Sequence, residues 1–132
     1  MTKKNKLLVL IPALWASLFD AVITIVHQPK AYWNGDLTIA NEANDIGHFV
    51  MNQHVSGIFI LCGLWLIIIG LLGYYSPKKY SRVFLLFVLI AHSFGASSWL
   101  SMLYGFWTAI IYILFNAILF YKIEDLVTKD KV

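Results

Sequence analysis

Apolar residues along this chain gather in four long segments, at about residues 7–26, 55–75, 83–100 and 102–121. A helix of about 20 mostly apolar residues crosses a bilayer, because each residue adds about 1.5 Å. The segments are apolar on all sides, whereas a membrane strand alternates apolar and polar residues. The pattern therefore predicts an all-α polytopic membrane protein, in which residues 1–132 form a single transmembrane domain, an antiparallel four-helix transmembrane bundle.

The composition points to the same class of protein. Of the 132 residues, 60% are hydrophobic and 13% are charged, whereas a soluble domain is about half apolar and about one quarter charged. So short a chain has too little interior to bury this excess. A bilayer would take the place of that interior. The single cysteine, Cys62, lies inside an apolar segment, so an internal disulfide is excluded.

The basic residues indicate which side of the membrane is cytoplasmic. Nine of the ten precede the first segment, lie between the second and third, or follow the fourth: Lys3, Lys4, Lys6, Lys78, Lys79, Arg82, Lys122, Lys129 and Lys131. Only Lys30 lies in the first outer loop. Since Lys and Arg collect in cytoplasmic loops, both termini are expected on the cytoplasmic side of the cell (inner) membrane. The first segment begins like a signal peptide, but its length and Asp20 favour an uncleaved span.

Residues 27–54 form the one long polar loop, which is expected on the outer side. Pro29 ends the first helix, and the second half of the loop is predicted to be helical, with Asn44 or Asp45 as its cap. If this helix runs on into the second span, four polar residues share one face. These residues are Glu42, Asp45, His48 and Asn52.

Asp20 is the most informative residue, because a carboxylate inside a bilayer costs about 3 kcal/mol and needs a partner. His92 lies near the middle of the third segment, at a depth that differs from that of Asp20 by about 6 Å. The pair is interpreted either as a proton relay or substrate-binding site, or as a structural polar lock between helices. Asn116, in the inner third of the fourth segment, is predicted to be another helix lock.

A resemblance to a known family rests on two short patterns. They are Asp20-x-x-x-Thr24 and Asn41-Glu42-x-Asn44. The region of about residues 19–57 thereby resembles a family of small, uncharacterised bacterial four-helix integral membrane proteins. The family has a proline after the asparagine, where this chain has Asp45, so the start of the loop helix is left open. The resemblance implies the architecture and no activity.

These patterns suggest a polar intramembrane site, with the loop folded back toward the outer end of the bundle. Its expected members are Asp20, Thr24, Glu42, Asn44 and His92. A second set, Glu42, Asp45 and His48, offers the carboxylate and imidazole ligands that bind zinc and similar divalent metals. The chain has no H-E-x-x-H motif, and the alternative is a capped, solvated helix start. No cofactor is predicted, and a divalent metal is the alternative.

Three functional hypotheses follow. The chain has no phosphate-binding loop and no G-x-S-x-G elbow, which argues against a soluble-type enzyme. The leading hypothesis is a non-enzymatic multi-pass membrane protein, an accessory or small-molecule-binding subunit. The alternatives are a small proton- or ion-coupled transporter or channel subunit and an intramembrane metal-dependent enzyme. The expected partners are the lipid bilayer and either further copies of the chain or a larger membrane complex, but no nucleic acid.

Overall fold

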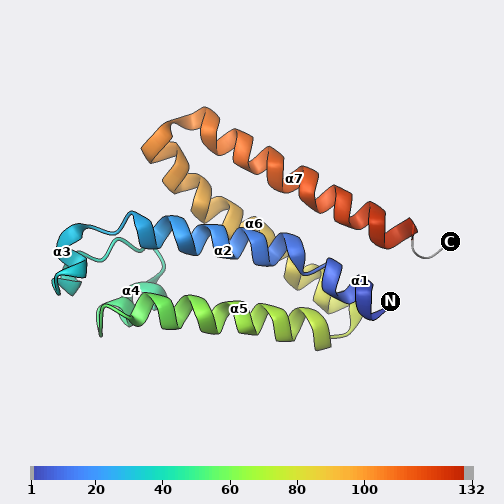
Figure 1. Ribbon diagram of the computed structural model, residues 1–132, viewed down its shortest axis with the longest axis horizontal. Helices are drawn as coiled ribbons and strands as arrows, with labels where there is room; N and C mark the ends of the chain where they lie inside the picture. The colour runs from blue at the N-terminus through green and yellow to red at the C-terminus, as the bar shows by residue number, and fades with distance from the viewer. Residues whose placement is uncertain (1, 130–132) are drawn as a thin grey trace.

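The computed structural model describes residues 2–129, and all regular structure in that range is helical. Four long helices carry the fold: α2 (Ile11–Val26), α5 (Gly57–Tyr75), α6 (Lys78–Tyr104) and α7 (Phe106–Lys129) (Figure 1). The short helix α1 (Lys3–Leu8) precedes α2, and the two together form the first of four stretches that are long and apolar enough to cross a membrane. The prediction of an all-helical chain with four such segments is therefore confirmed.

Pro12 accounts for the break between α1 and α2. Proline has no backbone N–H, so it cannot donate to the carbonyl one turn earlier, and it is tolerated in the first turn of a helix. Accordingly, α1 ends at Leu8 and α2 begins at Ile11, with Pro12 in its first turn. The two helices lie roughly end to end (Figure 1).

The helices α2 and α6 run side by side in the same direction through the centre of the molecule. Asp20 with His92 and His27 with Trp99 form two contacts between them, and both join residues 72 positions apart. A constant offset of this kind means that the two helices are parallel and in register. The helix α5 packs on one side of this central pair and α7 on the other (Figure 1). Fully buried alanines, Ala16 on α2 and Ala96 on α6, are small enough for helices to approach closely.

Short connections join the last three helices. The hydroxyl of Ser81 in α6 donates to the carbonyl of Gly73 in α5 at 2.6 Å, which fixes the turn between these helices. Between α6 and α7 the reversal falls on Gly105, whose φ of 92° is a conformation that favours glycine. The α6–α7 hairpin leans away from α5 at this end of the molecule (Figure 1).

The long loop is folded and tied to the end of α2. It contains α3 (Lys30–Trp33), a 3-10 turn (Leu37–Ile39) and α4 (Asp45–Met51). The side-chain amide of Gln28 donates to the carbonyl of Asn41, and its oxygen accepts from the Asn41 N–H, each at 2.8 Å. Buried Gln28 therefore holds the middle of the loop against the end of α2.

The second half of the loop does not continue into α5 as one helix. The helix α4 ends at Met51, and α5 begins only at Gly57, after a turn in which the Gly57 N–H donates to the carbonyl of His54. A Cβ on Gly57 would clash with the backbone carbonyl of Val50, so the two helices meet closely at this glycine. Glu42 consequently lies before α4 and not on its face, which corrects the continuous stripe considered above.

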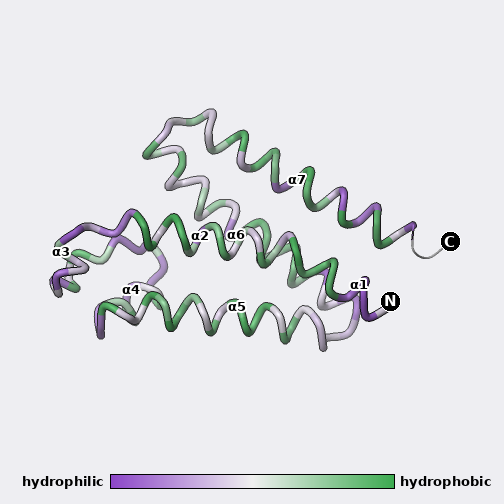
Figure 2. Tube along the Cα trace, viewed as in Figure 1, coloured by the Kyte–Doolittle hydropathy of each residue, from purple (hydrophilic) through white to green (hydrophobic). Residues whose placement is uncertain are grey.

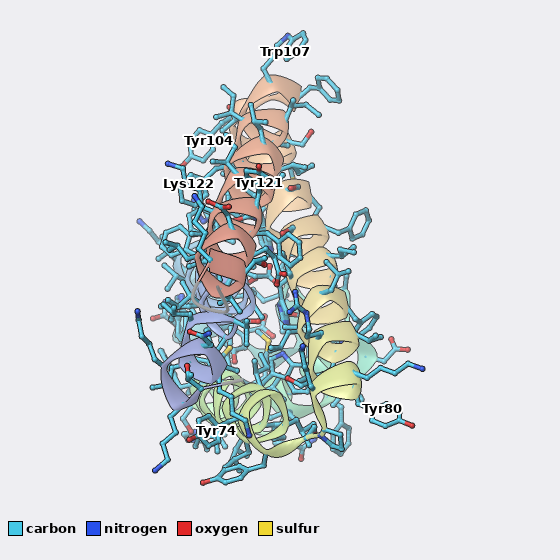
Figure 3. The ribbon with its side chains drawn as sticks, turned by 90° about the vertical axis from the view of Figure 1, so that its right-hand side faces the viewer. Tyr74, Tyr80, Tyr104, Trp107, Tyr121 and Lys122 are labelled. Atoms are coloured by element: carbon cyan, nitrogen blue, oxygen red, sulfur yellow. The ribbon has the colours of Figure 1, made fainter. Side chains whose placement is uncertain are left out.

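Large apolar side chains cover the outside of the long helices. On α7 they include Ile111, Leu114 and Ile118, each about half exposed, and similar residues lie on α5 and α6. Polar residues concentrate at the chain start, the long loop and the end of α7, while the middles of the helices are mostly apolar (Figure 2). Tyr80, in the first turn of α6, and Trp107, in the first turn of α7, project outward at opposite ends of the α6–α7 hairpin (Figure 3).

Candidate functional site

Asp20 and His92 lie in direct contact at the centre of the molecule. The Nδ1 atom of His92 on α6 lies 2.8 Å from Oδ2 of Asp20 on α2. The two side chains are 22% and 20% exposed, so the pair is largely but not completely enclosed. The structure thus brings together the two residues that sequence analysis paired by their depth.

Trp65 completes a chain of three side chains. Its Nε1–H, on α5, donates to Nε2 of His92 at 2.7 Å. An indole N–H can only donate, so Nε2 of His92 must be the acceptor and carry no proton. The proton of a neutral imidazole then lies on Nδ1, where it is donated to Asp20. Trp65 therefore selects a single tautomer of His92 and keeps the ring neutral while this hydrogen bond lasts.

Trp65 was not among the residues predicted for the site. The available signal was its position, because it lies in the middle of an apolar segment, whereas tryptophan in membrane proteins is enriched at the interfaces. A tryptophan at that depth needs a partner for its N–H, since an unpaired polar group in an apolar phase is costly. The four histidines of the chain include only one in such a segment, His92.

The arrangement has an electrostatic consequence for Asp20. Because His92 is held neutral, it donates a hydrogen bond to the carboxylate without cancelling its charge. The carboxyl group also lies against Gly95 of α6, the residue that leaves room for it between the helices. Asp20 is therefore an acid whose hydrogen-bond partner His92 carries no positive charge.

A buried polar layer lies beside this pair, between α6 and α7. The side-chain amide of Asn116 donates to the hydroxyl of Ser93 at 2.8 Å, and both residues are at least nine-tenths buried. The hydrogen bond joins the two helices, and the role of Asn116 as a helix lock stays a prediction. Ser93 was not singled out by its sequence position, because serine within a helix more often faces its own backbone.

The loop residues expected near Asp20 have other partners. Oε1 of Glu42 accepts from the N–H of Asn44 at 2.7 Å, and Oδ1 of Asn44 caps α4 by accepting from Ile46 and Gly47. Thr24 is buried on α2, and its carbonyl accepts from the amide of Gln28. Glu42 and Asn44 thus satisfy the loop backbone in this structure, and no hydrogen bond joins either one to Asp20 within residues 2–129.

The proposed metal ligands do not converge. His48 contacts Asn52 through Nδ1 at 3.0 Å, while Asp45 is exposed in the first turn of α4. Within residues 2–129, no three side chains of His, Cys, Asp or Glu form a cluster that could hold a metal ion. Glu42, Asp45 and His48 are therefore not a preformed ligand set in this conformation.

Comparison with protein-family models, curated proteins and solved structures found no match to this chain. The resemblance based on the two short patterns accordingly stays a prediction.

The chemistry of the site is that of an acid–base group rather than of a nucleophile. One oxygen of Asp20 is occupied by His92, and the side chain keeps some exposure. A proton or another single positive charge that binds there is stabilised by the carboxylate, and the His92 hydrogen bond fixes the orientation of the acceptor. In membrane proteins, ionisable residues within apolar spanning segments commonly mark an ion or substrate pathway.

Proposed function

We propose that this protein is an integral membrane protein of the cell membrane, with four spans in an antiparallel bundle and both ends in the cytoplasm. Support comes from the four apolar helical stretches and from the apolar residues on their outer faces. The beginning of α1 and the end of α7 lie at the same end of the molecule (Figure 1). The basic residues around 78–82 and at both chain ends support the orientation with both ends in the cytoplasm, because Lys and Arg collect in cytoplasmic segments.

Reporter fusions test this topology. An enzyme that is active only in the cytoplasm should be active when fused at either chain end, and a periplasmic reporter inserted beside Gly35 should be active outside. Gly35 is a suitable insertion point because its neighbours are exposed and a Cβ there would meet nothing within 4 Å. Activity of the periplasmic reporter at either terminus would overturn the proposed orientation.

We further propose that the protein is non-enzymatic and reversibly binds one positive charge at Asp20, either a proton or a small cationic molecule. The observation that carries this proposal is the hydrogen bond from Trp65 to Nε2 of His92. It keeps His92 neutral, so the only charge of the pair is that of Asp20. A lone carboxylate in an apolar region is stabilised by binding a positive charge and costs several kcal/mol without one.

Infrared difference spectroscopy on the purified protein in lipid nanodiscs tests this function. As the pH is lowered, a carbonyl band from a protonated carboxyl group should appear in the wild type and be missing in Asp20→Asn. Potassium and tetramethylammonium salts then distinguish the two kinds of ligand. A small cation that binds at Asp20 competes with the proton and moves the titration to lower pH, whereas a proton-only site titrates at the same pH in both salts.

Matched controls keep this result specific. Asp125→Asn removes an acid whose side chain is more exposed, near the end of α7, and the band assigned to Asp20 should persist in that variant. The groups around Asp20 that can titrate are His92, Cys62 and Tyr112, and the carboxyl band separates Asp20 from all three. Identical spectra from the wild type and Asp20→Asn over the whole range would contradict the proposal.

A further inference from the structure

A cavity opens between α2, α6 and α7 at the end of the molecule that holds the chain termini. Its volume is about 270 Å³, and an ion pair between Arg82 of α6 and Glu124 of α7 lies in its wall. The deeper wall is formed by Ala13, Leu89 and Phe120, one from each helix. Pro12, in the first turn of α2, and Val9, just before this helix, also line the cavity.

One helical turn beyond each of these three wall residues stands a buried polar side chain. Ser17 follows Ala13 on α2, Ser93 follows Leu89 on α6, and Asn116 lies one turn before Phe120 on α7, which runs the opposite way. Positions four apart lie on the same helix face, so all three point along the line of the cavity. Each is at least nine-tenths buried.

A second polar layer follows after another turn. It consists of Asp20 on α2, Ser97 on α6 and Tyr112 on α7. Ser97 and Tyr112 are both 8% exposed, and Tyr112 lies close enough to Asp20 to interact with its charge. The cavity, the first polar layer and the layer of Asp20 therefore succeed one another along the same three-helix interface.

Two of these polar groups have an unmet hydrogen-bond requirement. Within residues 2–129, the hydroxyls of Ser17 and Ser97 are buried and have no hydrogen-bond partner, whereas the side chains of Tyr112 and Asn116, one turn apart on α7, lie close enough to interact with each other. Buried polar atoms are almost always hydrogen-bonded, and water fulfils this role in protein interiors when it has two to four polar partners. The hydroxyls of Ser17 and Ser97, one in each layer, are the groups that water would satisfy here.

The interface beyond the second layer is apolar. Ile23, Ala96, Leu100 and Ala109 are all buried and pack around the ring of Tyr112. Phe19 stacks on the same ring at a centroid distance of 4.6 Å. This apolar cluster lies between the polar layers and the α6–α7 turn, and Phe19, Ile23 and Leu100 from it line a second cavity beside His27. The buried polar layers themselves lie on the side of the cavity beside Arg82 and Glu124.

From this arrangement we propose that a hydrated path between α2, α6 and α7 connects Asp20 to the cytoplasm. The path starts at the Arg82–Glu124 cavity and passes Ser17, Ser93 and Asn116. Its hydration rests on the buried polar groups alone, while its role as the route by which a proton or cation reaches Asp20 rests on the proposed function.

Cysteine accessibility tests the path directly. In a Cys62→Ala background, Ser97→Cys places a thiol in the second layer, and Ser98→Cys places the same group one residue away on the exposed face of α6. A membrane-impermeant, charged thiol reagent added to inside-out vesicles should label Ser97→Cys completely. Ser98→Cys, which faces lipid under the proposed topology, should stay unlabelled because thiols react as thiolates in water.

A variant that blocks the cavity provides a second test of the path. Ala13→Phe fills the deep wall of the cavity and should abolish labelling of Ser97→Cys from the cytoplasmic side. Labelling of Ser97→Cys only from the outer side, or unaltered labelling in the plugged variant, would overturn the path. Normal titration of Asp20 in the Ser97→Cys protein shows that this variant is folded. Lack of labelling in such a folded protein would also overturn the path.

These outcomes separate the path from the proposed function. Labelling should be the same when Asp20→Asn is added, since hydration does not depend on the carboxylate. Labelling without any titration of Asp20 would leave the path standing and remove the binding function. Titration of Asp20 without labelling would remove the path and leave the binding function standing.

Discussion

The carboxyl group of Asp20 rests on the bare Cα of Gly95. A Cβ at position 95 would lie 2.8 Å from Oδ2 and 2.9 Å from Oδ1 of Asp20, closer than real Cβ contacts allow. Both oxygens are therefore placed by a glycine on the neighbouring helix. The acid can reach His92 only because α2 and α6 approach without an intervening side chain.

Gly95→Ala should displace the Asp20 carboxyl group and weaken its hydrogen bond to His92. The expected result is a changed carboxyl band and titration of Asp20 in the infrared experiment, in a protein that still folds. Gly63→Ala is the matched control, since a Cβ at position 63 meets nothing within 4 Å. Because alanine favours a helix over glycine by about 0.5–1 kcal/mol, Gly63→Ala should leave the site intact and stability equal or slightly higher.

Trp65→Phe should remove the constraint on the tautomer of His92. Phenylalanine keeps the aromatic packing against Phe84 but has no N–H, so Nε2 of His92 loses its donor. Nothing then holds Nε2 in the acceptor state. The ¹⁵N shift of Nε2 should report an unprotonated nitrogen that accepts a hydrogen bond in the wild type, and it should change in the variant. Trp107→Phe, on an exposed side chain, is the control and should leave the His92 spectrum unchanged.

The Asp20–His92 contact could be predicted from the sequence, because the depth of a residue along a spanning helix follows from its position in the segment. Both residues are the only ionisable groups at mid-depth in their segments, and a buried carboxylate requires a partner. Trp65 and Ser93 could not be found in this way. Their contacts depend on how each helix is rotated about its axis, and uniformly apolar helices carry no amphipathic pattern from which that rotation can be read.

The loop was the part that sequence reasoning described least well. Glu42 and Asn44 were expected to turn toward Asp20, but each satisfies backbone N–H groups within the loop. Short polar side chains commonly compete for nearby backbone donors in this way. The reciprocal bonds between Gln28 and Asn41, which set the position of the loop, join residues 13 apart in no recognisable motif.

The hydrogen bond between Asn116 and Ser93 should contribute measurably to stability. In a double-mutant cycle of Asn116→Leu and Ser93→Ala, a coupling energy of about 0.6 kcal/mol is expected, the average for such bonds between membrane helices. The free energy of unfolding in mixed micelles provides the measurement. Ser98→Ala replaces Ser93→Ala in the control cycle, because Ser98 bonds only to its own helix, at the carbonyl of Gly95. Zero coupling in both cycles would mean that Asn116 does not lock α7 to α6.

Tyr32 should make the folded loop sensitive to alkaline pH. Its side chain is completely buried, and this burial raises the pKa of the hydroxyl above the ordinary value of 10.0. The folded state therefore keeps the phenol neutral where the unfolded chain ionises. A group whose pKa is raised on folding leaves stability unaffected below the unfolded pKa, so the loss begins only as the pH rises above 10.0.

The loss should amount to at most about 1.4 kcal/mol for each pH unit above that value, until the folded protein ionises as well. Tyr32→Phe removes the titrating group, so its free energy of unfolding should decline less steeply in this range than that of the wild type. Tyr121→Phe changes a side chain that is 72% exposed and should keep the slope of the wild type. Equal slopes for Tyr32→Phe and the wild type would mean that the loop opens and hydrates Tyr32 before the rest of the protein unfolds.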